Sequence, residues 1–124
     1  MTSVARHGLA LALAIAIHHP LAFPDEPPAL PAWELPFDVW QRPRTASYVL
    51  AQEPIRAAVQ SWIGRLERDP QAILVIQHPG GEDGTVWAAE LRDWLVALAV
   101  PGSAIELRPG GVAEDKLLLS IESP

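Results

Sequence analysis

The sequence predicts a small α+β domain, in which two amphipathic helices cover one face of a β-sheet. Residues 53–69 and 85–100 each repeat apolar side chains with a helical period, and two short apolar runs, 72–77 and 105–107, alternate with them. Helices that bury only one stripe each, and that alternate with strands, have to pack against a sheet.

The first helix is predicted to begin at Glu53-Pro54. Proline suits the first helical position because its missing N–H would have no partner there, and the acidic residue suits the positive end of the helix dipole. Asp69-Pro70 ends the helix, since the residue before a proline is pushed out of the helical region. The apolar stripe follows positions i, i+4, i+7, i+8 and i+11: Ile55, Val59, Trp62, Ile63 and Leu66.

The second helix is predicted to follow a buried strand at 72–77. The continuous apolar run Ile73–Ile76 is too short for a helix and indicates a strand covered on both faces or nearly so. Thr85 is the expected N-cap, with Asp83 as the competing choice, and Pro101-Gly102 ends the helix. The apolar stripe has the same spacing as in the first helix: Trp87, Leu91, Trp94, Leu95 and Leu98.

The remaining strands flank this central stretch. Residues 35–41 alternate apolar and polar side chains and are the expected first strand, and residues 42–52 are an expected connection. Ile105 and Leu107 begin a third strand, and residues 116–122 form the last. A short glycine turn between the last two strands predicts a hairpin.

The N-terminal residues 1–22 have the pattern of a secretory signal. Arg6 precedes an apolar run at 8–17 that is too short to span a bilayer, and a proline-rich stretch follows at once. A buried helix of the mature domain is the alternative reading, and cleavage is expected after Ala22. The mature chain is therefore expected to lack a transmembrane span.

Residues 23–36 carry five prolines and are expected to form an extended linker or arm, because neither a helix nor a central strand tolerates that density. A weak proline-rich ligand motif at Pro28–Pro31 is the alternative to a simple spacer. The folded domain is then expected to cover residues 37–122.

Composition excludes several classes of function. The chain has 124 residues and a net charge of −6, which argues against nucleic acid and anionic membrane surfaces as partners. It has no cysteine, so disulfides, thiol catalysis and iron–sulfur clusters are excluded. Five tryptophans and 49% apolar residues are enough for a core.

The order of elements and several short segments resemble the OmpA-like domain of bacterial cell envelopes. Phe37-Asp-Val39 is similar to the first strand of that family, residues 55–77 to its first helix and second strand, and residues 87–107 to its second helix and third strand. Asp93-Trp94-Leu95 stands where the family has Asp-Tyr-Leu. The resemblance implies a mixed four-stranded sheet with two helices on one face, and an envelope location.

The sequence departs from this family at the residues that bind its ligand. Members that bind peptidoglycan carry a Thr-Asp pair after the second strand, where this chain has His78-Pro79. They also carry an arginine near the start of the second helix, where this chain has Trp87-Ala88. The usual peptidoglycan site therefore does not carry over.

The candidate ligand-binding or partner-binding residues lie around the break between the second strand and the second helix. They are His78, Gly80, Gly81, Glu82, Asp83, Thr85 and Trp87. One histidine beside two adjacent carboxylates is a weak metal signal, and a solvated acidic loop is the simpler reading. Trp87 stands in the first turn of its helix, where it is either a partly exposed anchor or part of the core. Trp33 and Trp40 lie outside the helices and are open to the same two readings.

No catalytic constellation, cofactor site or phosphate loop is predicted. The expected function is that of an exported, non-catalytic envelope module with a protein partner, in the periplasm and associated with the outer membrane. A peptidoglycan-binding domain that uses a non-standard site in the 78–85 loop is the alternative.

Overall fold

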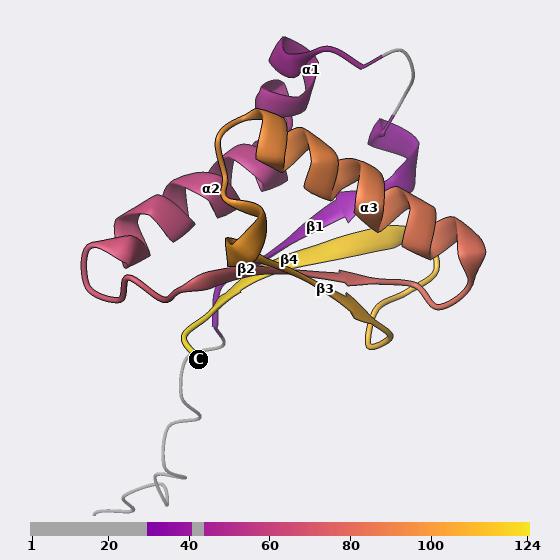
Figure 1. The fold of residues 1–124 in the computed structure, drawn as a ribbon. Coiled ribbons are helices and arrows are strands. Elements are labelled where there is room, and N and C mark those ends of the chain that lie inside the picture. Colours follow the sequence, from indigo (N-terminus) through magenta and orange to yellow (C-terminus); the bar gives the residue numbers. More distant parts are fainter. Residues whose placement is uncertain (1–29, 41–43) are drawn as a thin grey trace, which may run out of the picture.

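The computed structural model describes residues 30–40 and 44–124, which form one four-stranded sheet with its helices on one face (Figure 1). The predicted α+β class and the mixed sheet are confirmed, because one strand pair is parallel and two are antiparallel. The predicted signal, residues 1–22, lies outside the described residues. Within the described ranges, no helix is long and apolar enough to cross a membrane.

The sheet has the strand order β1-β4-β2-β3. The strands are β1 (Ala32–Pro36), β2 (Ile73–His78), β3 (Ile105–Pro109) and β4 (Lys116–Glu122). β2 is parallel to β3 and antiparallel to β4, and lies between them. The predicted hairpin between the last two strands is therefore wrong. β2, the most continuously apolar strand, is one of the two inner strands, where it is paired on both edges and can be covered on both faces.

The first strand lies earlier than predicted, inside the expected linker. β1 ends at Pro36, and residues 37–39 form a short 3-10 helix, η1 (Phe37–Val39), instead of a strand. Trp33 and Leu35 face the helices, with Leu35 fully buried. The prolines are tolerated because β1 is an edge strand, in which one row of backbone N–H groups needs no partner in the sheet.

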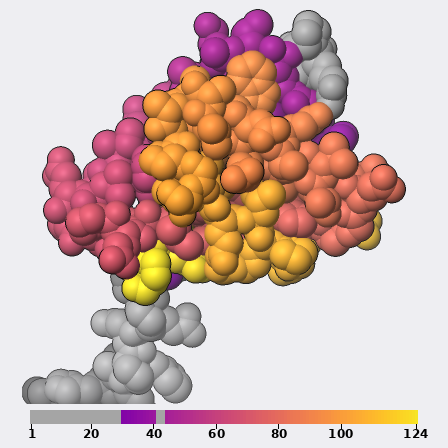
Figure 2. Space-filling model, viewed as in Figure 1, coloured from indigo at the N-terminus to yellow at the C-terminus, as the bar shows by residue number. Residues whose placement is uncertain are grey.

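Three helices lie on one face of the sheet: α1 (Ala46–Ala51), α2 (Glu53–Leu66) and α3 (Glu82–Ala97). In the same orientation, α2, α3 and the connection after α3 form a continuous surface (Figure 2). The core between helices and sheet includes residues of both predicted stripes, among them Ile55, Trp62, Leu91 and Leu95. The indole Nε1 of Trp62 donates a 2.8 Å hydrogen bond to the backbone oxygen of Ala72.

One member of the first stripe is not buried. Ile63 is 54% exposed, although it was predicted to face the core. It lies about 80° round the helix from Ile55, and the arc of α2 that the sheet covers is narrower than the sequence pattern suggested. The stripe is completed instead by Ala58, which is fully buried.

Part of the expected connection at 42–52 is helical. Thr45 caps α1 through its Oγ1, which accepts a 3.1 Å hydrogen bond from the backbone N–H of Tyr48. A threonine in extended conformation is a favourable N-cap, and this bond satisfies one of the unpaired donors at the helix start. Residues 41–43 lie outside the described part of the chain.

α3 begins and ends at different residues from those predicted. Its N-cap is Gly81, in a backbone conformation (φ 94°) that favours glycine, so neither Thr85 nor Asp83 caps the helix. The helix ends at Ala97. Ala99 adopts φ 76°, and the N–H groups of Ala99 and Val100 donate to the backbone oxygens of Val96 and Leu95. This is a Schellman ending, two residues before Pro101.

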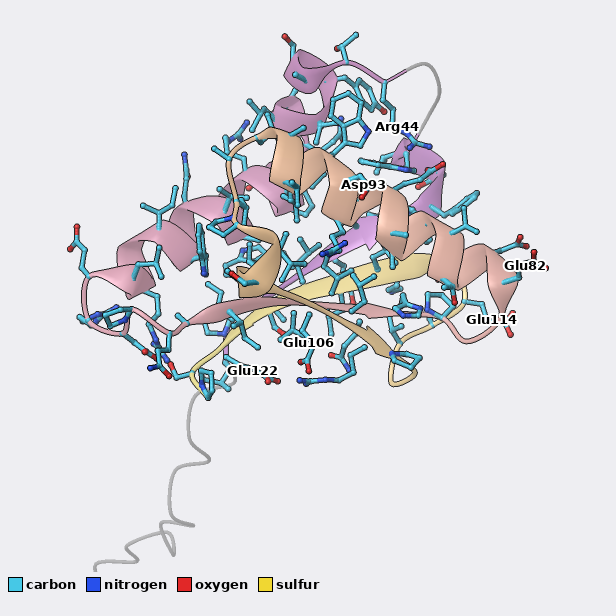
Figure 3. The ribbon with its side chains drawn as sticks, in the orientation of Figure 1. Arg44, Glu82, Asp93, Glu106, Glu114 and Glu122 are labelled. Atoms are coloured by element: carbon cyan, nitrogen blue, oxygen red, sulfur yellow. The ribbon has the colours of Figure 1, made fainter. Side chains whose placement is uncertain are left out.

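The face of the sheet opposite the helices carries charge (Figure 3). Arg108 on β3 reaches across β2 to Glu122 on β4 through two hydrogen bonds of 2.6 and 2.9 Å, and also pairs with Glu106. Hydrogen bonding to Arg108 lowers the pKa of the Glu122 carboxyl. Val75 on β2 pairs with Glu106 in the register and lies on the same face of the sheet as this cluster. It is fully buried, although no helix covers that face.

Candidate partner-binding groove

A groove of about 430 Å³ lies where η1, the residue before the α1 cap and the first half of α3 meet. Its volume is within the range of small-ligand and side-chain pockets. We call it the aromatic groove, and its lining residues are Phe37, Trp40, Arg44, Glu82, Asp83, Val86, Trp87 and Glu90.

The η1 turn delivers two of the aromatic side chains. The chain leaves β1 at Pro36, and the backbone N–H of Phe37 donates a 2.8 Å bond to the oxygen of Asp115, which holds the turn against the start of β4. The N–H of Trp40 then donates to the oxygen of Phe37, which closes the turn. Both rings therefore arise from a segment that is fixed at each end by backbone hydrogen bonds.

Phe37 and Trp87 form the apolar wall. Their ring centroids are 4.6 Å apart and the rings are perpendicular, a favourable edge-to-face arrangement. Phe37 is 55% exposed, and Val86, which immediately precedes Trp87 in α3, is 52% exposed. Trp87 is only 3% exposed, so of its two readings core packing is confirmed and the partly exposed anchor is wrong. The exposed apolar surface belongs to Phe37 and Val86, and Trp87 supports it from behind.

Arg44 and Glu90 form the polar side of the groove. The Arg44 guanidinium lies 4.1 Å from the centroid of the Trp40 ring, and its Nη1 is 2.7 Å from Oε2 of Glu90. The Trp40 Nε1 also points to this carboxylate at 3.5 Å. Only 8% of the Arg44 side chain is exposed, so the cation is held by a carboxylate and an aromatic face at once.

Two buried donors in the lining residues have no hydrogen-bond acceptor. They are the Nε of Arg44 and the indole Nε1 of Trp87. An unpaired buried donor costs roughly 1–3 kcal/mol relative to a paired one. A groove that leaves two such donors unpaired gains stability from any occupant that supplies an acceptor after a small side-chain movement.

Glu82 and Asp83 form the acidic end of the groove. Both are exposed in the first turn of α3, where the helix dipole favours negative charge. Figure 3 shows Glu82 projecting from the end of α3. Neither carboxylate forms an ion pair within the described residues.

The predicted site residues do not stay together in one loop. Glu82, Asp83 and Trp87 line the aromatic groove, and His78, Gly80, Gly81 and Thr85 do not. The His78 ring is buried, with Nδ1 2.9 Å from the oxygen of Pro79. Thr85 lies inside α3, and its Oγ1 donates a 2.8 Å bond to the oxygen of Gly81.

Sequence reasoning missed four lining residues, Phe37, Arg44, Val86 and Glu90, and left Trp40 open between an anchor and a core residue. One of them carried a usable signal: Val86 lies off the apolar stripe of its helix, so it is an apolar residue where a polar one is the default. Phe37 occupies an apolar position of the predicted strand at 35–41, so it did not stand out. Arg44 and Glu90 carried none, because 46 residues separate them and only the fold brings them together.

The side chains that line the aromatic groove suit the binding of a partner. Among the residues that the structure describes, the lining groups are carboxylates, one guanidinium and apolar side chains, with no hydroxyl, thiol or imidazole. Within residues 30–40 and 44–124, no three histidine, aspartate or glutamate side chains are grouped so that they could hold a metal ion. Apolar contact, charge and hydrogen-bond donors are the means of binding that the groove offers.

Comparisons with protein-family models, with curated proteins and with solved structures find no match for this chain.

Proposed function

We propose that this chain is an exported, non-catalytic module of the cell envelope that binds a protein partner in the periplasm through the aromatic groove. The signal-like segment at 1–22 and the resemblance to OmpA-like domains support the compartment. The exposed apolar pair Phe37 and Val86, set beside charged groups, supports the mode of action.

The groove has the composition of a small interface centre. Aromatic and arginine side chains are enriched where partners bind, and clustered aromatic side chains carry much of the binding energy. Phe37, Trp40, Arg44 and Trp87 bring three aromatic rings and one arginine to a single groove. Arg44 and Trp87 also lose little side-chain entropy on binding, because both side chains are already held in place by their neighbours.

Site-specific photo-crosslinking in cells that encode the chain tests this proposal. A benzophenone amino acid replaces Phe37 in one variant and Ile63 in another. These side chains are matched in exposure, at 55% and 54%, but Ile63 lies on α2 and does not line the groove. We expect a discrete protein adduct from position 37 in the periplasmic fraction and none from position 63.

A pair of arginine substitutions on α3 provides the second arm. Val86→Arg places a cation on the apolar part of the groove, and Val96→Arg makes the same change at a 44% exposed valine outside it. We expect Val86→Arg to abolish the adduct from position 37 and Val96→Arg to leave it. Equal adducts from all variants, or a chain that stays in the cytoplasm, would contradict the proposal. Co-sedimentation with purified sacculi that Val86→Arg does not weaken would favour the peptidoglycan alternative.

A further inference from the structure

We infer that the occupant of the aromatic groove is a protein segment that carries a lysine or arginine next to an apolar side chain. The inference rests on the proposed function and names the chemistry of its partner. Three features of the groove lead to it: its charge, its apolar wall and its two unpaired donors.

The charge of the groove selects a cation. Among the described lining residues, Glu82, Asp83 and Glu90 contribute three negative charges and Arg44 one positive charge, which leaves two negative charges. Arg44 is paired with Glu90 at 2.7 Å, so the uncompensated charge lies at Glu82 and Asp83. The whole chain carries a net charge of −6 and adds to this field. A lysine or arginine side chain placed between these two carboxylates gains charge-assisted hydrogen bonds.

The apolar wall selects a hydrophobic neighbour for that cation. Val86 follows Glu82 by one helical turn, so the exposed valine and the carboxylate lie on the same side of α3. Phe37 packs edge-to-face on Trp87 in the same wall, with ring centroids 4.6 Å apart. An aliphatic or aromatic side chain that covers Phe37 and Val86 therefore lies directly beside a cation bound at Glu82.

The unpaired donors select a peptide backbone. Arg44 Nε and Trp87 Nε1 are both covered from water and lack acceptors, and their side chains are 8% and 3% exposed. A backbone carbonyl between the cationic and the apolar residue supplies the acceptor once either side chain shifts. The arm at 23–36 of this chain does not have the required charge, because its charged residues, Asp25, Glu26 and Glu34, are all acidic.

Selection from a random-peptide phage library tests the inference, with the full chain as bait and the Glu82→Gln/Asp83→Asn variant for counter-selection. We expect the enriched peptides to carry lysine or arginine beside an aliphatic or aromatic residue. A synthetic enriched peptide should bind the Glu82→Gln/Asp83→Asn variant at least about tenfold more weakly than the wild type, a change of about 1.4 kcal/mol.

The matched control removes the same charge elsewhere. Glu53→Gln/Glu67→Gln neutralises two exposed carboxylates at the ends of α2, outside the groove, and should leave the affinity unchanged. Nuclear magnetic resonance gives an independent readout. The indole N–H signal of Trp87, identified by its loss in Trp87→Phe, should shift as the peptide is added, because that donor gains an acceptor.

Two outcomes would overturn the inference. Enriched peptides without basic residues would show that the acidic end does not select the partner, and an equal loss of affinity in both double variants would show that only the overall charge matters. A Val86-dependent adduct from position 37 would keep the proposed function in either case. Conversely, basic peptides that bind in the groove of a chain retained in the cytoplasm would refute the proposed function and leave the inference intact.

Discussion

Gly84→Ala tests whether the end of β2 and the start of α3 are packed as closely as the structure shows. A Cβ at position 84 would lie 2.1 Å from the backbone oxygen of Pro79, 2.8 Å from its carbonyl carbon and 3.0 Å from its Cβ. Pro79 is buried and its carbonyl is part of the backbone, so no side-chain rotation relieves the contact. The first turn of α3 has to move by about 0.9 Å before the shortest distance reaches 3.0 Å.

The expected effect is the difference between two opposing terms. Alanine is preferred over glycine inside a helix by about 0.5–1 kcal/mol. Overpacking a tight site costs about 1–3 kcal/mol, and a clash with backbone belongs at the upper end of that range. We therefore expect Gly84→Ala to lower the free energy of unfolding by about 2 kcal/mol, which corresponds to about 10 °C in Tm for a domain of this size.

Gly64→Ala is the matched control. Gly64 lies inside α2, and a Cβ there would have no atom within 4 Å, so only the helix preference remains. We expect this variant to be more stable than the wild type by about 0.5–1 kcal/mol. Urea denaturation followed by circular dichroism gives both values. If Gly84→Ala were as stable as Gly64→Ala, α3 would not approach Pro79 closely and the geometry of the groove would need revision.

Three further substitutions test other parts of the fold. Trp62→Phe removes the donor to the Ala72 carbonyl and should cost about 1–3 kcal/mol in urea denaturation, and a cost near zero would mean that the bond does not form. Hydrogen bonding to Arg108 lowers the pKa of Glu122 from its ordinary value of 4.5. The ion pair therefore stabilises the fold at pH values above 4.5, and this contribution is lost as the pH falls through the lowered pKa of the folded state. The urea midpoint of Glu122→Gln should thus fall less than that of the wild type between neutral pH and acid, and parallel curves would contradict this. Ala99→Gly removes the steric strain of an alanine at φ 76°, but it also raises the conformational entropy of the unfolded state. The net effect should be a stabilisation of about 0.5–1 kcal/mol, and a loss of stability would argue against the left-handed ending of α3.

Elements whose signals are local were predicted well. α2 begins at Glu53, as the Glu-Pro start predicted, and β4 covers residues 116–122, as its alternating pattern predicted. The apolar run at 73–76 is a strand with both faces covered, as expected, although charged side chains cover one of the faces. In each case the residues that decide the structure lie within one element.

The candidate site was predicted only in part. The sequence indicated the right region of α3, and Glu82, Asp83 and Trp87 do line the groove. It did not predict that Trp87 is buried beneath Phe37, because that contact joins residues 50 positions apart. Nor could it show that His78 is buried, because the burial of a residue at a strand end depends on the helix packed above it.

The sequence by itself determined the α+β class, the helical stripes and the chemical character of the residues around the second helix. These follow from periodicity, composition and capping, which act between neighbours in the chain. The tertiary structure alone decided that β1 falls among the prolines, that β2 separates β3 from β4 and that Arg44 meets Glu90. Strand order and long-range ion pairs are chosen by the burial of whole faces, a free energy that depends on all the elements together and that no local segment carries.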